Sequence, residues 1–201
     1  LKDFASAGFD GTLKNSLDFP EKLYELFDCC NVLEECPKPI IAAVHGKCVG
    51  GGLDIIAACD IRLCTKDATF SLKEASIGLV ADMGVLQRLP LIIGQSFTRE
   101  MAYTAGFFSA EEVARMGLVS GIYADRKAVM EEAKKLAGQI AENAPLAVQQ
   151  TKKVLNYSRN ATVEDGMSMA MHKNMVLLFS QDVREAMTAF MEKRKPNFKG
   201  K

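Results

Sequence analysis

Apolar residues in the first part of this chain gather in short runs that end at glycine or at charged residues. A continuous or alternating apolar run of about four to eight residues, bounded in this way, is typical of a buried β-strand. We therefore expect strands in the following runs: Pro39–Gly46, Asp60–Cys64, Ala68–Leu72 and Leu118–Tyr123.

Apolar residues at spacings of three and four predict helices around these runs. Pro20 suits the first position of a helix that extends to Leu33. A triple glycine at residues 50–52 precedes a short helix at residues 53–59, so strand, turn and helix form the first half of a βαβ unit. Further helices are expected near residues 85–89 and 95–104.

Helix signals dominate the rest of the chain. Ser109 and Glu112 have capping-box spacing at the start of one helix, and Gly117 suits its C-terminal end. After Tyr123, apolar stripes predict consecutive helices near residues 126–142, 145–156, 162–179 and 181–193. We predict an α/β core in residues 1–125, followed by a helical region in residues 126–201.

Charge and composition exclude several functions. Lys and Arg total 25, as do Asp and Glu, so a net charge of zero gives no electrostatic reason to expect nucleic acid. No apolar run approaches the roughly 20 residues of a membrane span. The 6 cysteines lack C-x-x-C spacing and lie in apolar runs, which indicates buried free thiols. With only 2 histidines, a metal site is not expected.

Residues that could take part in catalysis or binding are concentrated in a few segments. They are Phe4–Asp10 with an Ala-Gly-x-Asp motif, His45–Asp54 with the triple glycine, the pair Lys73–Glu74, and Gly78–Gly84. A triple glycine alone is more often a tight turn than an anion site. It has neither the G-x-G-x-x-G spacing of dinucleotide folds nor the Gly-Lys-Ser/Thr of a P-loop.

In their order along the chain, these motifs resemble the crotonase superfamily of enoyl-CoA hydratases and isomerases. The resemblance covers essentially the whole chain and includes Ala57–Arg62 and Lys193–Pro196. It implies a crotonase-like ββα spiral core and a C-terminal helical trimerisation region. Members of the superfamily begin with a strand–helix–strand portion before the Ala-Gly-x-Asp motif, and we expect these N-terminal elements to be missing here.

The resemblance implies an oxyanion hole of two backbone N–H groups, from Ala7 and Gly51, which binds the thioester oxygen as an enolate forms. Gly51 precedes a predicted helix, whose N-terminal dipole favours developing negative charge. The residues implied to contact substrate are Ala5, Gly8, Asp10, Gly50, Phe107 and Lys193. For Phe107, core packing is the alternative. Coenzyme A is part of the substrate, so no separate cofactor is expected.

Three carboxylates distinguish reactions within the superfamily. Hydratases carry Glu at the positions of Asp54 and Glu74 and usually Gly at that of Asp82, whereas the trio found here resembles the dienoyl-CoA isomerase branch. Shifting two double bonds requires proton removal at one carbon and return at a distant one, which suits two separated acid/base groups. The resemblance implies Asp82 as the base at C2 and Glu74 as the acid toward C6, or the reverse.

Asp54 would order this pair or adjust its pKa values. The structural alternative for Asp82 is to cap the helix that begins near Gly84.

The expected activity is isomerisation of 3,5-dienoyl-CoA to 2,4-dienoyl-CoA in fatty-acid β-oxidation. The alternatives are an enoyl-CoA hydratase and a non-catalytic or RNA-binding protein of the same fold. We expect an acyl-CoA substrate and a homo-trimer or hexamer, without nucleic acid or membrane. The expected compartment is the mitochondrial matrix or the peroxisome, or the cytoplasm of a bacterium, and no targeting signal is visible.

Overall fold

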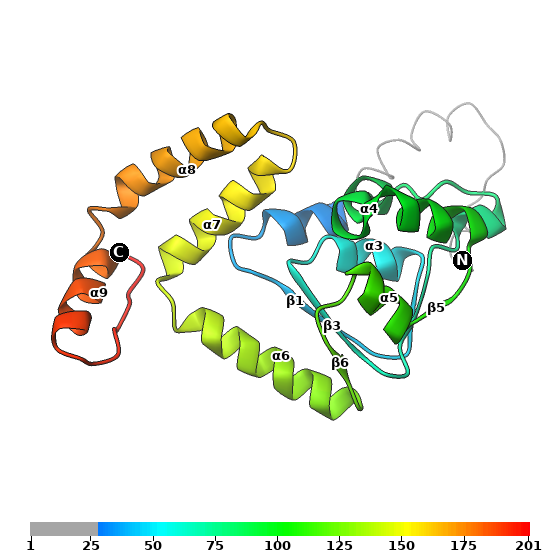
Figure 1. Cartoon of the computed structure of the whole chain (residues 1–201), viewed down its shortest axis with the longest axis horizontal. Coiled ribbons are helices and arrows are strands. Elements are labelled where there is room, and N and C mark those ends of the chain that lie inside the picture. The colour runs from blue at the N-terminus through cyan, green and yellow to red at the C-terminus, as the bar shows by residue number, and fades with distance from the viewer. Residues whose placement is uncertain (1–27) are drawn as a thin grey trace, which may run out of the picture.

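Two small sheets lie at the centre of the fold (Figure 1). The computed structural model describes residues 28–201. The first sheet is parallel, in the order β1 (Ile41–Val44), β3 (Ile61–Thr65) and β6 (Ile122–Tyr123). In the second sheet β4 pairs parallel with β2 and antiparallel with β5, and its order is β2 (Lys47–Val49), β4 (Thr69–Ser71) and β5 (Phe108–Ser109).

Helices connect and cover these strands. Residues 28–35 are helical. Between the strands lie α3 (Gly51–Ala57), the 3-10 helix η1 (Glu74–Ile77), α4 (Val85–Thr104) and α5 (Ala110–Met116). After β6 come α6 (Arg126–Ala141), α7 (Pro145–Ser158), α8 (Val163–Leu177) and α9 (Gln181–Met191). This order confirms the predicted α/β core with a helical C-terminal region.

The sheet of β1, β3 and β6 is covered on both faces, because side chains alternate along a strand. On one face, Ile41 and Leu63 pack with Val129 of α6. On the other face, Val44 and Cys64 belong to the main core, to which α3, α4 and α5 also contribute. Burial on both faces explains why these strands read as continuous apolar runs.

The structure differs from the predicted elements mainly in their extent. Gly94 has φ 78° and ψ 165° and interrupts α4, at the gap between the helices predicted near residues 85–89 and 95–104. The strand predicted at Leu118–Tyr123 is limited to β6. The sequence did not predict β2 and β5, because two or three residues are too few to set a period. The predicted helix start at Pro20 lies outside the described residues.

The predicted helix caps and free cysteines agree with the structure in most respects. The capping box is confirmed, since the Ser109 N–H donates to Glu112 Oε2 at 2.7 Å and Ser109 Oγ accepts from the Glu112 N–H. Gly117 ends α5 in the left-handed conformation. All six cysteines are free, but Cys29 is exposed and Cys36 is half-buried, so burial was predicted wrongly for these two.

Residues 28–201 contain no cluster of three or more side chains that could hold a metal ion. Within the same range, no helix is both long enough and apolar enough to cross a membrane.

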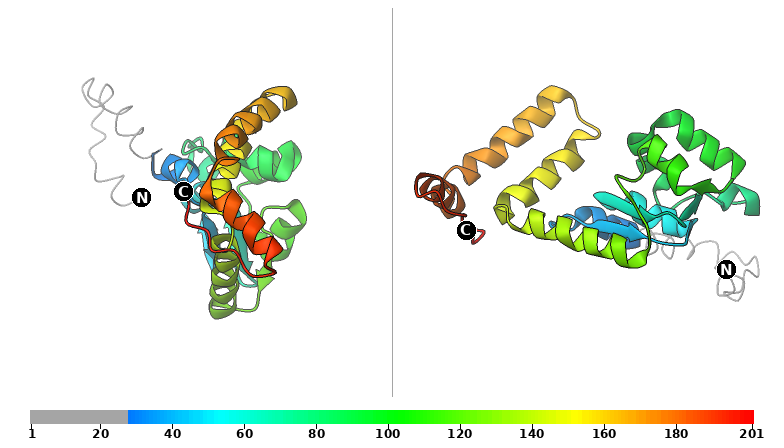
Figure 2. Two further views of the ribbon diagram at one scale, coloured as in Figure 1. Left: turned by 90° about the vertical axis from the view of Figure 1, so that its left-hand side faces the viewer. Right: turned by 60° about the horizontal axis from the view of Figure 1, so that its bottom comes forward.

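The helices after β6 differ in how closely they approach the sheets. α6 packs against β1, β3 and β6, α7 contacts the segment before β1, and α8 packs on α7. α8 and α9 extend away from the sheets (Figures 1 and 2). The predicted division between residues 1–125 and 126–201 stays a prediction. α6 lies after that boundary and yet packs on one face of the core.

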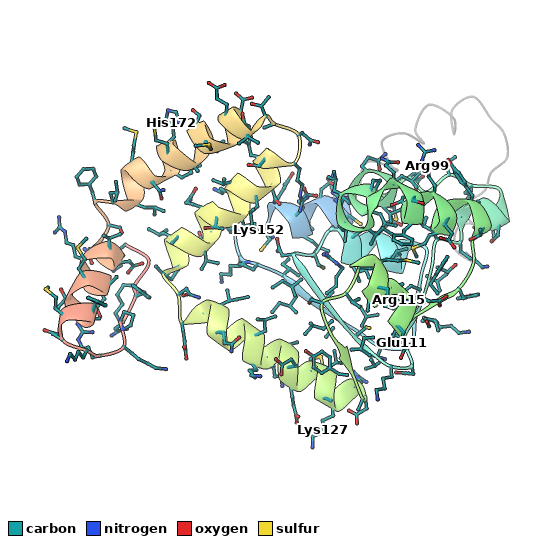
Figure 3. All side chains as sticks on the ribbon, in the orientation of Figure 1. Arg99, Glu111, Arg115, Lys127, Lys152 and His172 are labelled. Atoms are coloured by element: carbon teal, nitrogen blue, oxygen red, sulfur yellow. The ribbon has the colours of Figure 1, made fainter. Side chains whose placement is uncertain are left out.

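A buried lysine holds α7 on the core (Figure 3). Lys152 is 5% exposed, and its Nζ donates to the carbonyl oxygens of Leu33 at 3.0 Å and Lys38 at 3.2 Å. It also donates to Asp60 Oδ2 at 2.7 Å, which accepts in addition from the Ile40 N–H. These three acceptors satisfy all the donors of the ammonium group, so its burial is compensated.

Replacing this lysine should destabilise the fold. In Lys152→Met, Asp60 and two carbonyl groups lose a charged partner in a site with little water, and we expect unfolding to become easier by about 3 kcal/mol. Urea denaturation followed by circular dichroism measures this change. Lys153→Met, at the exposed neighbouring position, is the control and should change stability by less than about 0.5 kcal/mol. Equal effects of the two variants would contradict the assigned role.

Candidate active site

The triple glycine forms a turn between β2 and α3. Gly50 has φ 56° and ψ −123°, a conformation that glycine adopts without steric cost. Its N–H donates to the carbonyl of Ser71 at 3.0 Å, which continues the pairing of β2 with β4. Gly51 is the first residue of α3, so its N–H precedes the first turn of hydrogen bonds in the helix. A backbone donor at a helix N-terminus is suited to a developing negative charge.

Glu74, at the start of η1, lies against this turn. A Cβ atom built on Gly50 would stand 2.9 Å from Glu74 Oε1, so the carboxylate occupies space that only glycine leaves free. Glu74 Oε2 is buried and has no hydrogen-bond partner among the described residues. Buried polar atoms are normally paired, so this oxygen is one that the fold itself does not use.

Asp54 is the buried member of the trio. It is 2% exposed, and its Oδ1 accepts a hydrogen bond of 2.9 Å from the N–H of Val85. Val85 begins α4, and the N-cap residue Gly84 supplies no side-chain acceptor. Asp54 therefore serves α4 as a cap from another helix, and it fixes the start of α4 against α3.

Burial and neighbouring charges together change the pKa of Asp54. Burial raises the pKa of this carboxyl to about 6, the hydrogen bond from Val85 opposes the rise, and the charges of Glu74 and Asp82 add to it. The guanidinium of Arg88 acts in the opposite direction. Glu74 lies against Gly50, at the turn that precedes Asp54, and Asp54 accepts from Val85, just after Asp82, so the structure brings the three segments that carry the trio together.

Asp82 is exposed, in the turn that leads from η1 to α4. The alternative in which it caps α4 is wrong, because the Val85 N–H donates to Asp54. A pocket of about 420 Å³ opens beside Asp82, and its walls come from the helix at residues 28–35, from α4 and from the connection between α7 and α8. Asp82 is thus the member of the trio that is open to a small molecule.

Phe107 lies in the connection between α4 and β5. It is 55% exposed, so the core-packing alternative is wrong for this residue. Lys73 Nζ stands 4.7 Å from the centre of its ring and donates to the carbonyl of Ala105 at 2.6 Å. The side chain beside Glu74 in sequence therefore holds this connection close to η1.

The remaining predicted residues lie elsewhere. Lys193 follows α9 with φ 53°, at the end of the chain farthest from α3 in Figure 1, so a single chain does not bring it to the trio. Four others lie outside the described residues: Ala5, Ala7, Gly8 and Asp10. Lys73 was noted only as the neighbour of Glu74, and Arg88 was not predicted as a site residue, although a cation near each of the two carboxylates is visible in the sequence.

The raised pKa of Asp54 predicts an unusual pH dependence of stability. The folded chain holds the proton between about pH 4 and pH 6 and the unfolded chain releases it, so stability falls as pH rises through this window. Asp54→Asn keeps an oxygen for the Val85 N–H and has no charge to bury. We expect its free energy of unfolding to exceed that of the wild type by about 2–3 kcal/mol at pH 7.

This difference should shrink toward zero at pH 4, where the wild-type carboxyl is protonated in the folded state. Urea denaturation at both pH values measures it. An equal difference at the two values would show that burial of the charge is not its source.

The chain is similar in sequence to curated proteins named as dienoyl-CoA isomerases. The chain is 41% identical over 186 residues to the mitochondrial Δ3,5-Δ2,4-dienoyl-CoA isomerase of Dictyostelium discoideum. The matched region covers 92% of the chain and 64% of the relative. It is 43% identical over 185 residues to the peroxisomal Δ3,5-Δ2,4-dienoyl-CoA isomerase of Arabidopsis thaliana, with 92% and 66% covered. The chain thus spans about two thirds of the length of these relatives.

A solved structure and a family model also match the chain. A crystal structure of an enoyl-CoA hydratase from Bacillus anthracis matches all of the chain and 75% of that protein, with a TM-score of 0.91 and 29% identity. This match confirms the expected fold. The family model described as enoyl-CoA hydratase/isomerase matches residues 7–201. The chain belongs to the enoyl-CoA hydratase/isomerase family.

Proposed function

We propose that this chain acts as a Δ3,5-Δ2,4-dienoyl-CoA isomerase in fatty-acid β-oxidation. The observation that carries the proposal is the placement of two carboxylates around a third. Glu74 lies at the glycine turn with one oxygen that has no hydrogen-bond partner among the described residues, and Asp82 lies exposed at the pocket. Asp54 is buried on α3, and its hydrogen bond from the Val85 N–H joins α3 to the start of α4. The names of the curated relatives support the same reaction.

The reaction needs one proton removed and one returned. A carboxylate takes a proton from C2 of the 3,5-dienoyl thioester, and the electrons of that C–H bond spread through the two double bonds and the carbonyl group. The thioester oxygen then carries negative charge. In the proposal the Gly51 N–H, at the start of α3, stabilises this charge together with the N–H of Ala7 that the family resemblance implies. A second carboxyl group gives a proton to C6, and the double bonds settle at positions 2 and 4.

The geometry supports Glu74 as the base at C2, which is the reverse of the order considered first. Its carboxylate rests on Gly50, one residue from the proposed oxyanion donor Gly51, so it lies at the thioester end of the site. Asp82 then supplies the proton at C6 from the pocket side. General acid–base groups act over hydrogen-bond distances, so a separate group at each end fits a transfer between distant carbons.

Hydration of a 2-enoyl-CoA is the second candidate, because Glu74 and the glycine turn would serve that reaction equally. A hydratase holds its water between two carboxylates. Here Asp54 is buried and one of its oxygens is bonded to the Val85 N–H, which leaves it poorly placed to bind and activate water. Asp82 also has no task in hydration. Both points favour isomerisation.

Activity is tested by supplying a 3,5-dienoyl-CoA and recording the absorbance of the conjugated 2,4-dienoyl product. We expect turnover in the wild type, and a loss of about 10²–10⁴-fold in either Asp82→Asn or Glu74→Gln, because each removes one acid/base group. Asp67→Asn changes an exposed carboxylate in the turn after β3 and serves as the matched control.

The same variants separate the competing functions. No product from the wild type at high enzyme concentration would refute the isomerase proposal. Efficient addition of water to a 2-enoyl-CoA, undiminished in Asp82→Asn, would favour the hydratase. Salt-sensitive RNA binding without thioester chemistry would instead support a non-catalytic member of the fold.

Isotope exchange assigns the two roles. In deuterated water, Asp82→Asn should still exchange the C2 hydrogens of the substrate while forming product far more slowly, because Glu74 remains able to remove a proton. Glu74→Gln should abolish exchange and product formation together. The opposite pattern would make Asp82 the base at C2.

Self-association into a trimer or hexamer is also part of the proposal. α8 and α9 expose many large apolar side chains, among them Met167, Met171 and Met175 at successive turns of one face of α8. A contiguous apolar surface of this kind is suited to a subunit contact. The curated relatives are named as mitochondrial or peroxisomal, and we propose one of these compartments for this chain.

Sedimentation velocity tests the assembly. We expect a trimer or hexamer at micromolar concentration, and a shift toward monomer in the double variant Met171→Lys with Met175→Lys, because two charges cannot be buried unpaired in an apolar contact. Glu164→Gln, on the same helix, is the control. A monomeric wild type would refute this part of the proposal.

A further inference from the structure

Arg88 joins three separate parts of the chain near Asp82. It lies in the first turn and a half of α4 and is 13% exposed in its side chain. Its Nε donates to Glu34 Oε2 at 2.6 Å and its Nη2 to Asn31 Oδ1 at 2.7 Å, both in the helix at residues 28–35. Its Nη1 donates to the carbonyl of Met83 at 3.3 Å.

The guanidinium also lies directly against the turn that carries Asp82. A Cβ atom at Gly84 would overlap Arg88 Nη1, so glycine at this position lets the arginine fold back over the backbone. Gly84 has φ 102°, which few other residues adopt. The backbone on the C-terminal side of Asp82 is therefore held by Arg88 from one direction and, through the Val85 N–H, by Asp54 from the other.

The partner of Arg88 is itself anchored. Glu34 uses its second oxygen to accept from Arg159 at the end of α7, at 2.6 Å, and its carbonyl accepts from Asn156 Nδ2 at 3.1 Å. Glu34 thus has fixed contacts on two sides, and the position of Arg88 relative to the core follows from them. A single surface ion pair contributes little, but a network of partly buried, charge-assisted bonds restricts geometry.

We propose that Arg88 is a positioning residue for Asp82. The guanidinium of Arg88 fixes the Asp82–Gly84 turn against the helix at residues 28–35. Only arginine has donors that reach a carboxylate, an amide oxygen and a backbone carbonyl at the same time, since its donors project from a planar group in different directions. The inference rests on the proposed function in so far as Asp82 acts on a substrate. Its structural part concerns the turn alone.

The experiment compares Arg88→Gln with Arg99→Gln in the intact chain. Arg99 is an exposed arginine farther along α4, whose bonds go to Gln95 and Tyr103 of the same helix (Figure 3). In Arg88→Gln we expect kcat for the 3,5-dienoyl-CoA to fall by about 10–100-fold with KM within threefold, because the substrate still binds while the acid is misplaced. Arg99→Gln should match the wild type.

Amide hydrogen exchange reports on the turn without any activity. We expect the protection of the Val85 amide to fall at least tenfold in Arg88→Gln and to stay unchanged in Arg99→Gln. Wild-type protection at Val85 with wild-type kcat in Arg88→Gln would overturn the inference. If the wild type has no isomerase activity, the proposed function fails, and the exchange measurement still decides whether Arg88 holds the turn.

A second variant covers the case in which Arg88→Gln does not fold. Arg88→Lys keeps the positive charge beside Glu34 but cannot reach all three acceptors. We expect it to fold, to lose about tenfold in kcat and to lose part of the protection at Val85. Wild-type values of kcat and protection in Arg88→Lys would show that charge alone suffices, and this result would refute the positioning role.

Discussion

The hydrogen bond from the Val85 N–H to Asp54 is the interaction on which the arrangement of the site depends. It joins the helix that follows the glycine turn to the helix that follows Asp82. A buried carboxylate with few donors is costly, and this cost appears as the raised pKa of Asp54. The bond holds the start of α4 against α3, so the turn that carries Asp82 lies near the helix that carries Asp54.

The three carboxylates of the candidate site differ in their hydrogen bonding and in their exposure to solvent. Asp54 is used by the structure, because it caps α4. Glu74 has a buried oxygen without a partner among the described residues, and Asp82 is exposed beside a pocket. Asp60, by comparison, is paired within the fold, because it accepts from Lys152 and from the Ile40 N–H. Functional groups are often found among buried atoms that lack a partner and among side chains at pockets, and this is the basis for proposing Glu74 and Asp82 as the proton-transfer pair.

Much of the fold was visible in the sequence because its signals are local. The capping box at Ser109 and Glu112 involves residues three apart, and the helices after Tyr123 follow their apolar stripes. Strand β1 was predicted because burial on both faces makes its apolar run continuous. Short strands such as β5 were missed, because they are defined by partners distant in the chain rather than by their own pattern.

The sequence by itself determined the family, the glycine turn and the identity of the three carboxylates, because these depend on residue types at fixed spacings. Only the tertiary structure decided where each carboxylate lies and what it contacts. Asp54 became a cap because α3 lies against the start of α4, and Glu74 lies at the turn because Gly50 has no side chain. Arg88 was unremarkable in sequence, and it gained a role because Glu34, far away along the chain, lies beside it. Such contacts arise from packing between distant segments, which no local pattern contains.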